Sequence, residues 1–269
     1  MIAIAHFIAI SCYLGAAALA AVPFARPVKA PTEGVLGVLG VGVMVHTAAL
    51  IAFALESSAA PLTGLGPALS FAGLVLAVTL LIVELLARDV SMTLIAAPLA
   101  AVSTAFANII GLTPGRSADG VRGVWLLSHI ALSFIGIAAF ATAAAAGAMY
   151  LVQRRELKSR RFGTIFRFFP PLATLDRVNH LAAIAGWLGL TLGVVLAVTY
   201  SVAYRELSVP KVIWATGAWL AVSAIALGRT VGGWQARRAA VYSSLSFAVV
   251  LALYVAFRVA ETNGGGRFL

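Results

Sequence analysis

The chain has 269 residues, of which 62% are hydrophobic and only 10% are charged, and its mean hydropathy is +1.02. Soluble domains carry about 25% charged residues, so this composition excludes an ordinary soluble protein and indicates an integral membrane protein. The net charge of +10 does not indicate nucleic-acid binding, because the basic residues lie beside apolar runs, where they set orientation and meet anionic lipid headgroups.

Eight apolar runs follow one another along the chain. Breaker residues separate them, such as Pro23 and Pro27 after the first run and Pro114 and Gly115 after the fourth. The runs are long enough for membrane-spanning helices, which need about 20 residues, and too long for barrel strands of about 10 residues. Because backbone polar groups must be hydrogen bonded in lipid, each run is predicted to be a helix. The predicted spans are residues 2–22, 34–55, 65–87, 91–111, 122–152, 180–204, 212–228 and 237–258.

The distribution of positive charge predicts the orientation of these spans. The first run has no positive leader, so we expect a retained span and not a cleaved signal peptide. Most of the 19 lysine and arginine residues follow the odd-numbered spans, above all in the segment 153–179. The positive-inside rule then places this segment in the cytoplasm and both termini on the non-cytoplasmic side. The predicted fold class is all-α, a polytopic membrane helix bundle of about eight transmembrane helices that forms one domain over residues 1–269.

Two histidines lie at similar predicted depths inside the membrane. His46 is nine residues from the outer end of the second span, and His129 is seven residues from the outer start of the fifth. A rise of 1.5 Å per residue puts them about 13 and 10 Å below the outer boundary. Neutral imidazoles at one level on two helices have the chemistry to be axial ligands of one haem iron. They would equally serve as two unrelated hydrogen-bonding side chains in helix contacts.

The other polar residues of the spans have simpler interpretations. His6 is expected near the outer face at a helix end, and His180 at the cytoplasmic interface. Glu84 precedes Arg88 by four residues, which predicts an ion pair on the helix surface that reaches the headgroups. The single cysteine, Cys12, cannot form a disulfide framework or a thiolate metal cluster, and we expect it to be a small buried residue.

The sequence contains none of the common catalytic signatures. GxxxxGK[ST], HExxH, CxxC and CxxCH are absent, and the nine acidic residues lie almost entirely in the predicted loops. A hydrolase or ATPase site cannot be assembled from what remains. No catalytic residues are therefore assigned, and a binding or assembly role is favoured over an enzyme.

Three segments of the second half carry a family resemblance. They read SHIALSFIGIAAFATAAAAGAMYLVQRRELK, FPPLATLDRVNHLAAIAGWLGLTLGVVLAV and GRTVGGWQARRAAVYSSLSFAVVLALYV. In this order and spacing they resemble the cytochrome c assembly protein family, and within it the HemX-like and YpjD-like branch of the CcsA-type proteins. The segment YRELSVPKVIWATGAW lacks the tryptophan cluster of haem-exporting members, which favours this branch.

The resemblance implies a function in the bacterial inner membrane. It implies haem binding or relay during cytochrome c biogenesis, with haem and other cytochrome c maturation proteins as partners beside the lipid bilayer. His129 matches the position of a haem-ligating histidine in haem-exporting members, and His46 is the second predicted ligand of the haem iron. Two alternatives remain: a haem-free scaffold or regulatory protein that docks a partner through the basic 153–179 segment, and a small-solute transporter.

Overall fold

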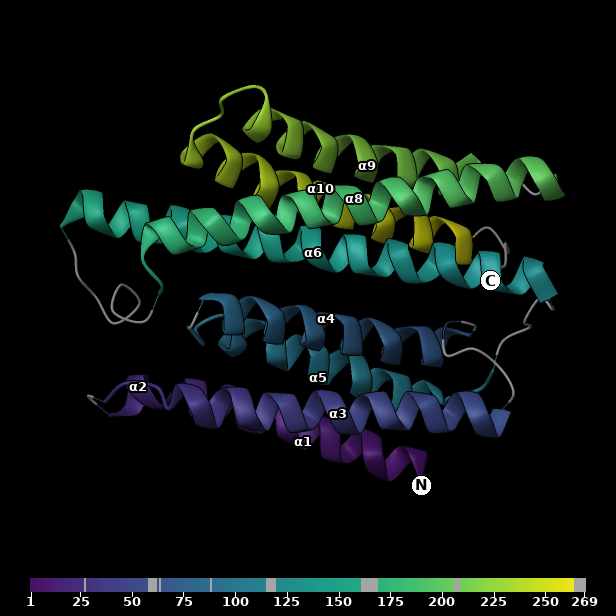
Figure 1. Cartoon of the computed structure of the whole chain (residues 1–269), viewed down its shortest axis with the longest axis horizontal. Helices are drawn as coiled ribbons and strands as arrows, with labels where there is room; N and C mark the ends of the chain where they lie inside the picture. The colour runs from purple at the N-terminus through teal and green to yellow at the C-terminus, as the bar shows by residue number, and fades with distance from the viewer. Residues whose placement is uncertain are drawn as a thin grey trace. The chain divides into compact units, whose positions relative to one another are not determined.

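The structure, a computed structural model, describes residues 1–26, 28–57, 62, 64–87, 89–114, 120–160, 169–205 and 209–263, except for the side chains of residues 210, 211 and 255–263. Every secondary-structure element in these ranges is a helix (Figure 1). Eight of the helices are long and apolar enough to cross a membrane, which confirms the predicted class, a polytopic all-helical membrane protein.

The helices follow the predicted spans in order. α2 is a single short turn. The elements are α1 (Ile2–Ala20), α2 (Val22–Ala25), α3 (Thr32–Ser57), α4 (Leu65–Ala87), α5 (Thr93–Ile110), α6 (Gly120–Ser159), α8 (Leu172–Tyr204), α9 (Val209–Thr230) and α10 (Ala236–Asn263).

Helices α6 and α8 are longer than the sequence predicted. With 40 and 33 residues, they extend about 60 and 50 Å, whereas the hydrocarbon core is about 30 Å thick. Residues 153–159 and 172–179, which we expected to belong to a loop, are helical and extend these two helices. Arginine, lysine, glutamate and leucine favour helix outside lipid as well as inside it, and Pro171 stands at the N-cap of α8. The rest of the predicted loop, residues 161–168, lies outside the described residues.

The helices form two compact units. In unit 1, α1 packs against α3 and α5, and α4 packs against α3 and α5. In unit 2, α6 packs against α8 and α10, while α9 packs against α8 and α10. Figure 1 shows α6 and α8 running side by side along most of their length. The single domain over 1–269 stays a prediction.

Glycines bring the helices of unit 2 into backbone contact. A Cβ atom on Gly136 of α6 would lie 2.6 Å from the backbone nitrogen of Leu190, and one on Gly189 of α8 would lie 2.9 Å from the Cα of Gly136. On another face of α6, a Cβ on Gly147 would lie 2.8 Å from the carbonyl oxygen of Ala240 in α10. Small residues at such crossings allow the close packing that holds membrane helices together.

Glu84 differs from its predicted setting. Its side chain is fully buried, so the prediction of a carboxylate on the helix surface is wrong. Thr93, the first residue of α5, donates its backbone N–H to Oε1 at 2.6 Å and its hydroxyl to Oε2 at 2.5 Å. The N–H groups of the first turn of a helix have no acceptor within that helix, and the helix dipole is positive there. The Glu84 carboxylate binds one of these groups at the start of α5. The predicted partner Arg88 lies outside the described residues.

Replacing Glu84 with alanine is expected to destabilise unit 1. The change leaves the buried N–H and hydroxyl of Thr93 without their acceptor, at a cost of about 1–3 kcal/mol. Glu84→Gln keeps one acceptor oxygen and should lie between wild type and Glu84→Ala. Thermal unfolding in detergent, with the exposed Glu56→Ala as control, checks the order. Equal melting temperatures for Glu84→Ala and Glu56→Ala would contradict this capping role.

Candidate functional site

His129 connects the two longest helices of unit 2. It lies on α6, and its Nδ1 is 2.8 Å from the carbonyl oxygen of Gly193 on α8. A carbonyl oxygen only accepts hydrogen bonds, so Nδ1 carries the proton and donates it. In the neutral ring the Nε2 lone pair is then the metal-binding one. His129 is half-buried.

The side chains one and two turns before His129 make similar contacts with α8. The Trp125 indole N–H donates to the carbonyl oxygen of Leu196 at 3.2 Å. The Arg122 Nε–H donates to the Tyr200 hydroxyl at 2.8 Å, and its guanidinium carbon lies 4.8 Å from the centroid of the Tyr204 ring. These contacts hold the helices in register and so fix the position of His129.

An apolar recess lies beside this row of contacts. It has a volume of about 370 Å³ and is lined by Val121, Val124, Trp125, Ser128 and Leu196. Ser128 immediately precedes His129, and Trp125 lies one turn away from it. Apolar, aromatic-lined recesses with few polar groups are the usual setting of cofactor sites.

His46 lies in a different setting, the core of unit 1. It is fully buried on α3, with its Nδ1 3.0 Å from the Tyr13 hydroxyl of α1 and its Nε2 2.9 Å from the Ser70 hydroxyl of α4. The same Ser70 oxygen is 2.7 Å from Nε2 of His6, which is also fully buried. The Nδ1 of His6 is 2.9 Å from the carbonyl oxygen of Ile2. We call Tyr13, His46, Ser70 and His6 the histidine network.

With both rings neutral, the histidine network has one consistent arrangement of protons. His6 Nδ1 must donate to the Ile2 carbonyl, so His6 Nε2 accepts the single proton of the Ser70 hydroxyl. Ser70 can then only accept from His46 Nε2–H, and His46 Nδ1 accepts from Tyr13. All four ring nitrogens are thereby hydrogen bonded, and buried polar groups that are fully paired stabilise a single packing.

The structure thus brings His6 and His46 together, with ring centroids 5.1 Å apart. His6 lies near the start of α1, the helix end at which it was predicted, and it is fully buried and hydrogen bonded there. His129 belongs to the other unit, and its pairing with His46 as ligands of one iron stays a prediction. Ligation by His46 would require its Nε2 to leave Ser70 or its Nδ1 to leave Tyr13.

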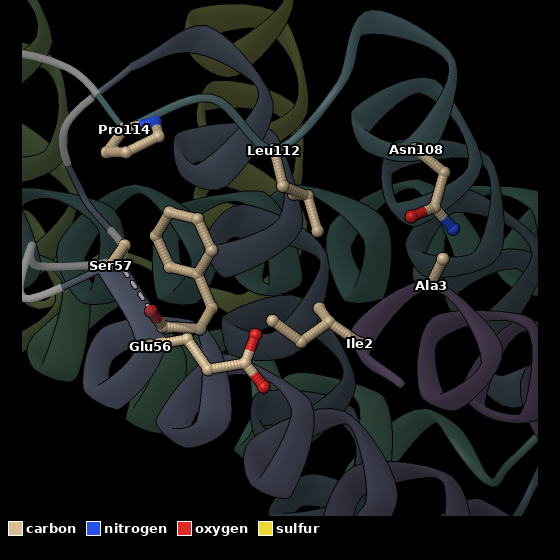
Figure 2. A pocket seen from close by; sticks show the side chains of 8 residues that line it. Ile2, Ala3, Glu56, Ser57, Asn108, Leu112 and Pro114 are labelled. Carbon is tan, nitrogen blue, oxygen red and sulfur yellow. Dashed lines mark hydrogen bonds between the residues drawn. The ribbon is translucent and has the colours of Figure 1, made fainter.

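A second recess opens in unit 1, with a volume of about 400 Å³. Figure 2 shows the Glu56 carboxylate and the Asn108 amide on different sides of it, with Ile2 and Leu112 between them. No histidine lines this recess. Ile2 lines it and also accepts the hydrogen bond of His6, so the histidine network ends beside this recess.

The last histidine, His180, lies on α8 near an ion pair between helices. Arg229 of α9 places Nη1 2.7 Å from Oδ1 of Asp176, one turn before His180. His180 is half-buried and its Nδ1 is buried, and its place at the cytoplasmic interface stays a prediction. Within the described residues, no group of three or more histidine, cysteine, aspartate or glutamate side chains could hold a metal ion.

Comparison with known proteins places the chain in a family. Residues 41–262, which include helices of both units, match the family described as cytochrome c assembly protein. An uncharacterised 28.8 kDa protein in a nifR3-like 5′ region of Azospirillum brasilense is 35% identical over 99 residues, which cover 36% of either chain. No solved structure matches. The match to the family covers most of the sequence, and the chain therefore belongs to the cytochrome c assembly protein family.

Proposed function

We propose that this multi-pass membrane protein assists cytochrome c biogenesis by binding or relaying haem, with His129 Nε2 as a ligand of the haem iron. The contact that supports this proposal is the hydrogen bond between His129 Nδ1 and the Gly193 carbonyl. Metal-ligating histidines characteristically donate their other ring N–H to a carbonyl or carboxylate, which fixes the tautomer and the ring orientation.

The surroundings of His129 also fit a haem ligand. The recess lined by its neighbours Trp125 and Ser128, although not by His129 itself, is apolar, and a flat apolar macrocycle favours such a lining. Bound haem would supply the iron centre that is carried toward apocytochrome, whereas the chain's own residues hold, orient and shield it. We place this activity in a bacterial inner membrane, with other cytochrome c maturation proteins as partners and the HemX-like and YpjD-like branch as the nearest functional type.

His46 remains the second ligand that the sequence predicts. In its favour, imidazole is a common haem ligand, and the hydrogen bonds of His46 fit a neutral ring. Against it, both of its nitrogens already have protein partners, so coordination costs at least one hydrogen bond. The proposal therefore rests on His129, and His46 is tested separately.

Titration of the purified protein with haemin tests the proposal. We expect a shifted Soret band for wild type and binding about tenfold weaker or worse in His129→Gln, whose amide N–H can still donate to the Gly193 carbonyl but whose side chain does not ligate iron. Imidazole added to His129→Gly should restore the shifted band. His180→Ala, a histidine at another level of unit 2, is the matched control and should bind as wild type does.

Two results would overturn the assignment. A His129→Gln variant that binds haemin with the affinity and spectrum of wild type would remove His129 as a ligand. A wild-type protein that gives no shifted band while it remains folded by thermal unfolding would remove haem binding altogether and favour a haem-free scaffold.

A further inference from the structure

Helices α8 and α9 bury a row of polar side chains between them in unit 2. At one end Arg229 of α9 pairs with Asp176 of α8 at 2.7 Å. Farther along, the Trp219 indole N–H of α9 donates to the Thr191 hydroxyl of α8 at 2.9 Å. These two contacts show that the helices run antiparallel, and they fix which residues face each other between them.

Besides Asp176 Oδ1, which is ion-paired with Arg229, three buried polar atoms of this row have no hydrogen-bond partner among the described residues. They are Nδ1 of His180, Nε1 of Trp187 and Oγ of Ser223. Ser223 is only 7% exposed. At the two ends Asp176 is ion-paired with Arg229 and Trp219 is hydrogen bonded to Thr191, so the three atoms without any polar partner lie between these contacts.

The helix register places these atoms close together. Ser223 is six residues from Arg229, which contacts Asp176, and four residues from Trp219, which contacts Thr191. Counting the same numbers of residues along α8 from Asp176 and from Thr191 places Ser223 level with residues 182 to 187. His180 and Trp187 are seven residues, or about two turns, apart on α8, so they lie on the same face of the helix. Ser223 is one turn from Trp219 on α9 and therefore lies on the side facing α8. All three atoms lie within about 10 Å along the helix axes.

The cost of leaving these atoms unpaired identifies what binds them. A buried polar group without a hydrogen bond is strongly unfavourable, so three such groups side by side favour a ligand that both donates and accepts. The Trp187 indole only donates, the Ser223 hydroxyl does both, and the His180 ring nitrogen does either according to its tautomer. Water has this combination, and it binds buried sites that offer two to four polar partners.

We propose that α8 and α9 enclose a file of bound water that joins His180, Ser223 and Trp187 to the aqueous phase at the Asp176–Arg229 end. At that end, which lies near the start of α8 and the end of α9, the Asp176 and Arg229 side chains are 29% and 13% exposed. Trp219 closes the other end through its bond to Thr191. The file connects the His180 ring to the Asp176–Arg229 end, independently of any haem at His129.

Water-edited NMR of the protein in lipid nanodiscs tests this inference. The indole N–H resonance of Trp187, assigned with Trp187→Phe, is expected to show a direct cross peak with water and to exchange in D₂O within minutes. The indoles of Trp219 and Trp214 donate to Thr191 and to the Val250 carbonyl, so they are internal controls and should exchange at least about tenfold more slowly.

A variant of Ser223 makes the test specific. Ser223→Ala removes the hydroxyl without adding bulk and so removes one of the water's partners; it should weaken the Trp187 cross peak, whereas Ser244→Ala on α10 should not. The inference is overturned if Trp187 is as protected as Trp219 in the wild-type protein. It is equally overturned if Trp187 exchanges quickly but Ser223→Ala leaves its water cross peak unchanged.

Discussion

Replacing Gly189 with leucine is expected to push α8 away from α6 and to destabilise unit 2 by more than an ordinary overpacked core substitution. Even a Cβ at this position would lie 2.9 Å from the Cα and 3.0 Å from the backbone nitrogen of Gly136. Overpacking typically costs about 1–3 kcal/mol when side chains can move aside. Here the atoms in the way are backbone, so the helices themselves must separate.

The same separation should reach His129. Its acceptor, Gly193, lies one turn from Gly189 on α8, so a displaced helix lengthens the bond that fixes the imidazole. We therefore expect Gly189→Leu to lower both the melting temperature and the affinity for haemin, and thermal unfolding in detergent and Soret titration check these two effects.

Gly217→Leu is the matched control in the same unit, because nothing lies within 4 Å of a Cβ added there. Its melting temperature should stay close to that of wild type. A Gly189→Leu protein as stable as Gly217→Leu would contradict the backbone contact between α6 and α8.

Hydropathy was sufficient to predict the eight membrane-spanning helices, because each must satisfy its own backbone in lipid over about 20 residues. It did not predict where α6 and α8 end. Beyond an apolar run a helix continues as long as its residues favour helix and no breaker residue intervenes. Hydropathy therefore does not indicate where such a helix ends. The charged residues after Gln153 end the apolar run, but α6 continues to Ser159.

The histidine sites show a second limit. Counting residues gives the depth of His46 along its helix, but the direction in which the side chain points depends on which helices pack against α3. Those neighbours are α1 and α4, and they bring Tyr13 and Ser70 to the ring. A hydroxyl inside an apolar run was the available signal, since Ser70 and Tyr13 must find partners in lipid. The sequence alone does not pair them, because register between helices is set by packing.

Replacing Ser70 with alanine is expected to destabilise unit 1 by about 2 kcal/mol or more, although it removes a single oxygen atom. That oxygen contacts Nε2 of both His6 and His46, so its loss leaves two buried ring nitrogens unpaired. Interhelical hydrogen bonds in membrane proteins average only about 0.6 kcal/mol. Leaving a buried polar group unpaired costs about 1–3 kcal/mol. The two unpaired ring nitrogens, and not the lost hydrogen bonds themselves, therefore determine how far Ser70→Ala is destabilised. Thermal unfolding in detergent measures it.

Two further variants make the stability measurement specific. Tyr13→Phe removes the terminal donor of the histidine network and leaves one nitrogen unpaired, so its destabilisation should be smaller than that of Ser70→Ala. Ser11→Ala removes an exposed hydroxyl that bonds only to its own helix at Phe7, and its effect should stay within about 0.5 kcal/mol. Ser70→Ala and Ser11→Ala proteins of equal stability would show that the histidine network does not hold unit 1 together.

Haemin titration of the folded Ser70→Ala protein then separates the two roles of His46. If His46 is the second iron ligand, the variant should bind haemin more tightly than wild type, because Nε2 no longer has to leave the serine hydroxyl before it coordinates. If His46 serves only the histidine network, the affinity should be unchanged, since His129 and its bond to Gly193 belong to the other unit. Stability falls in both cases, so the change in affinity alone distinguishes a ligand from a structural histidine.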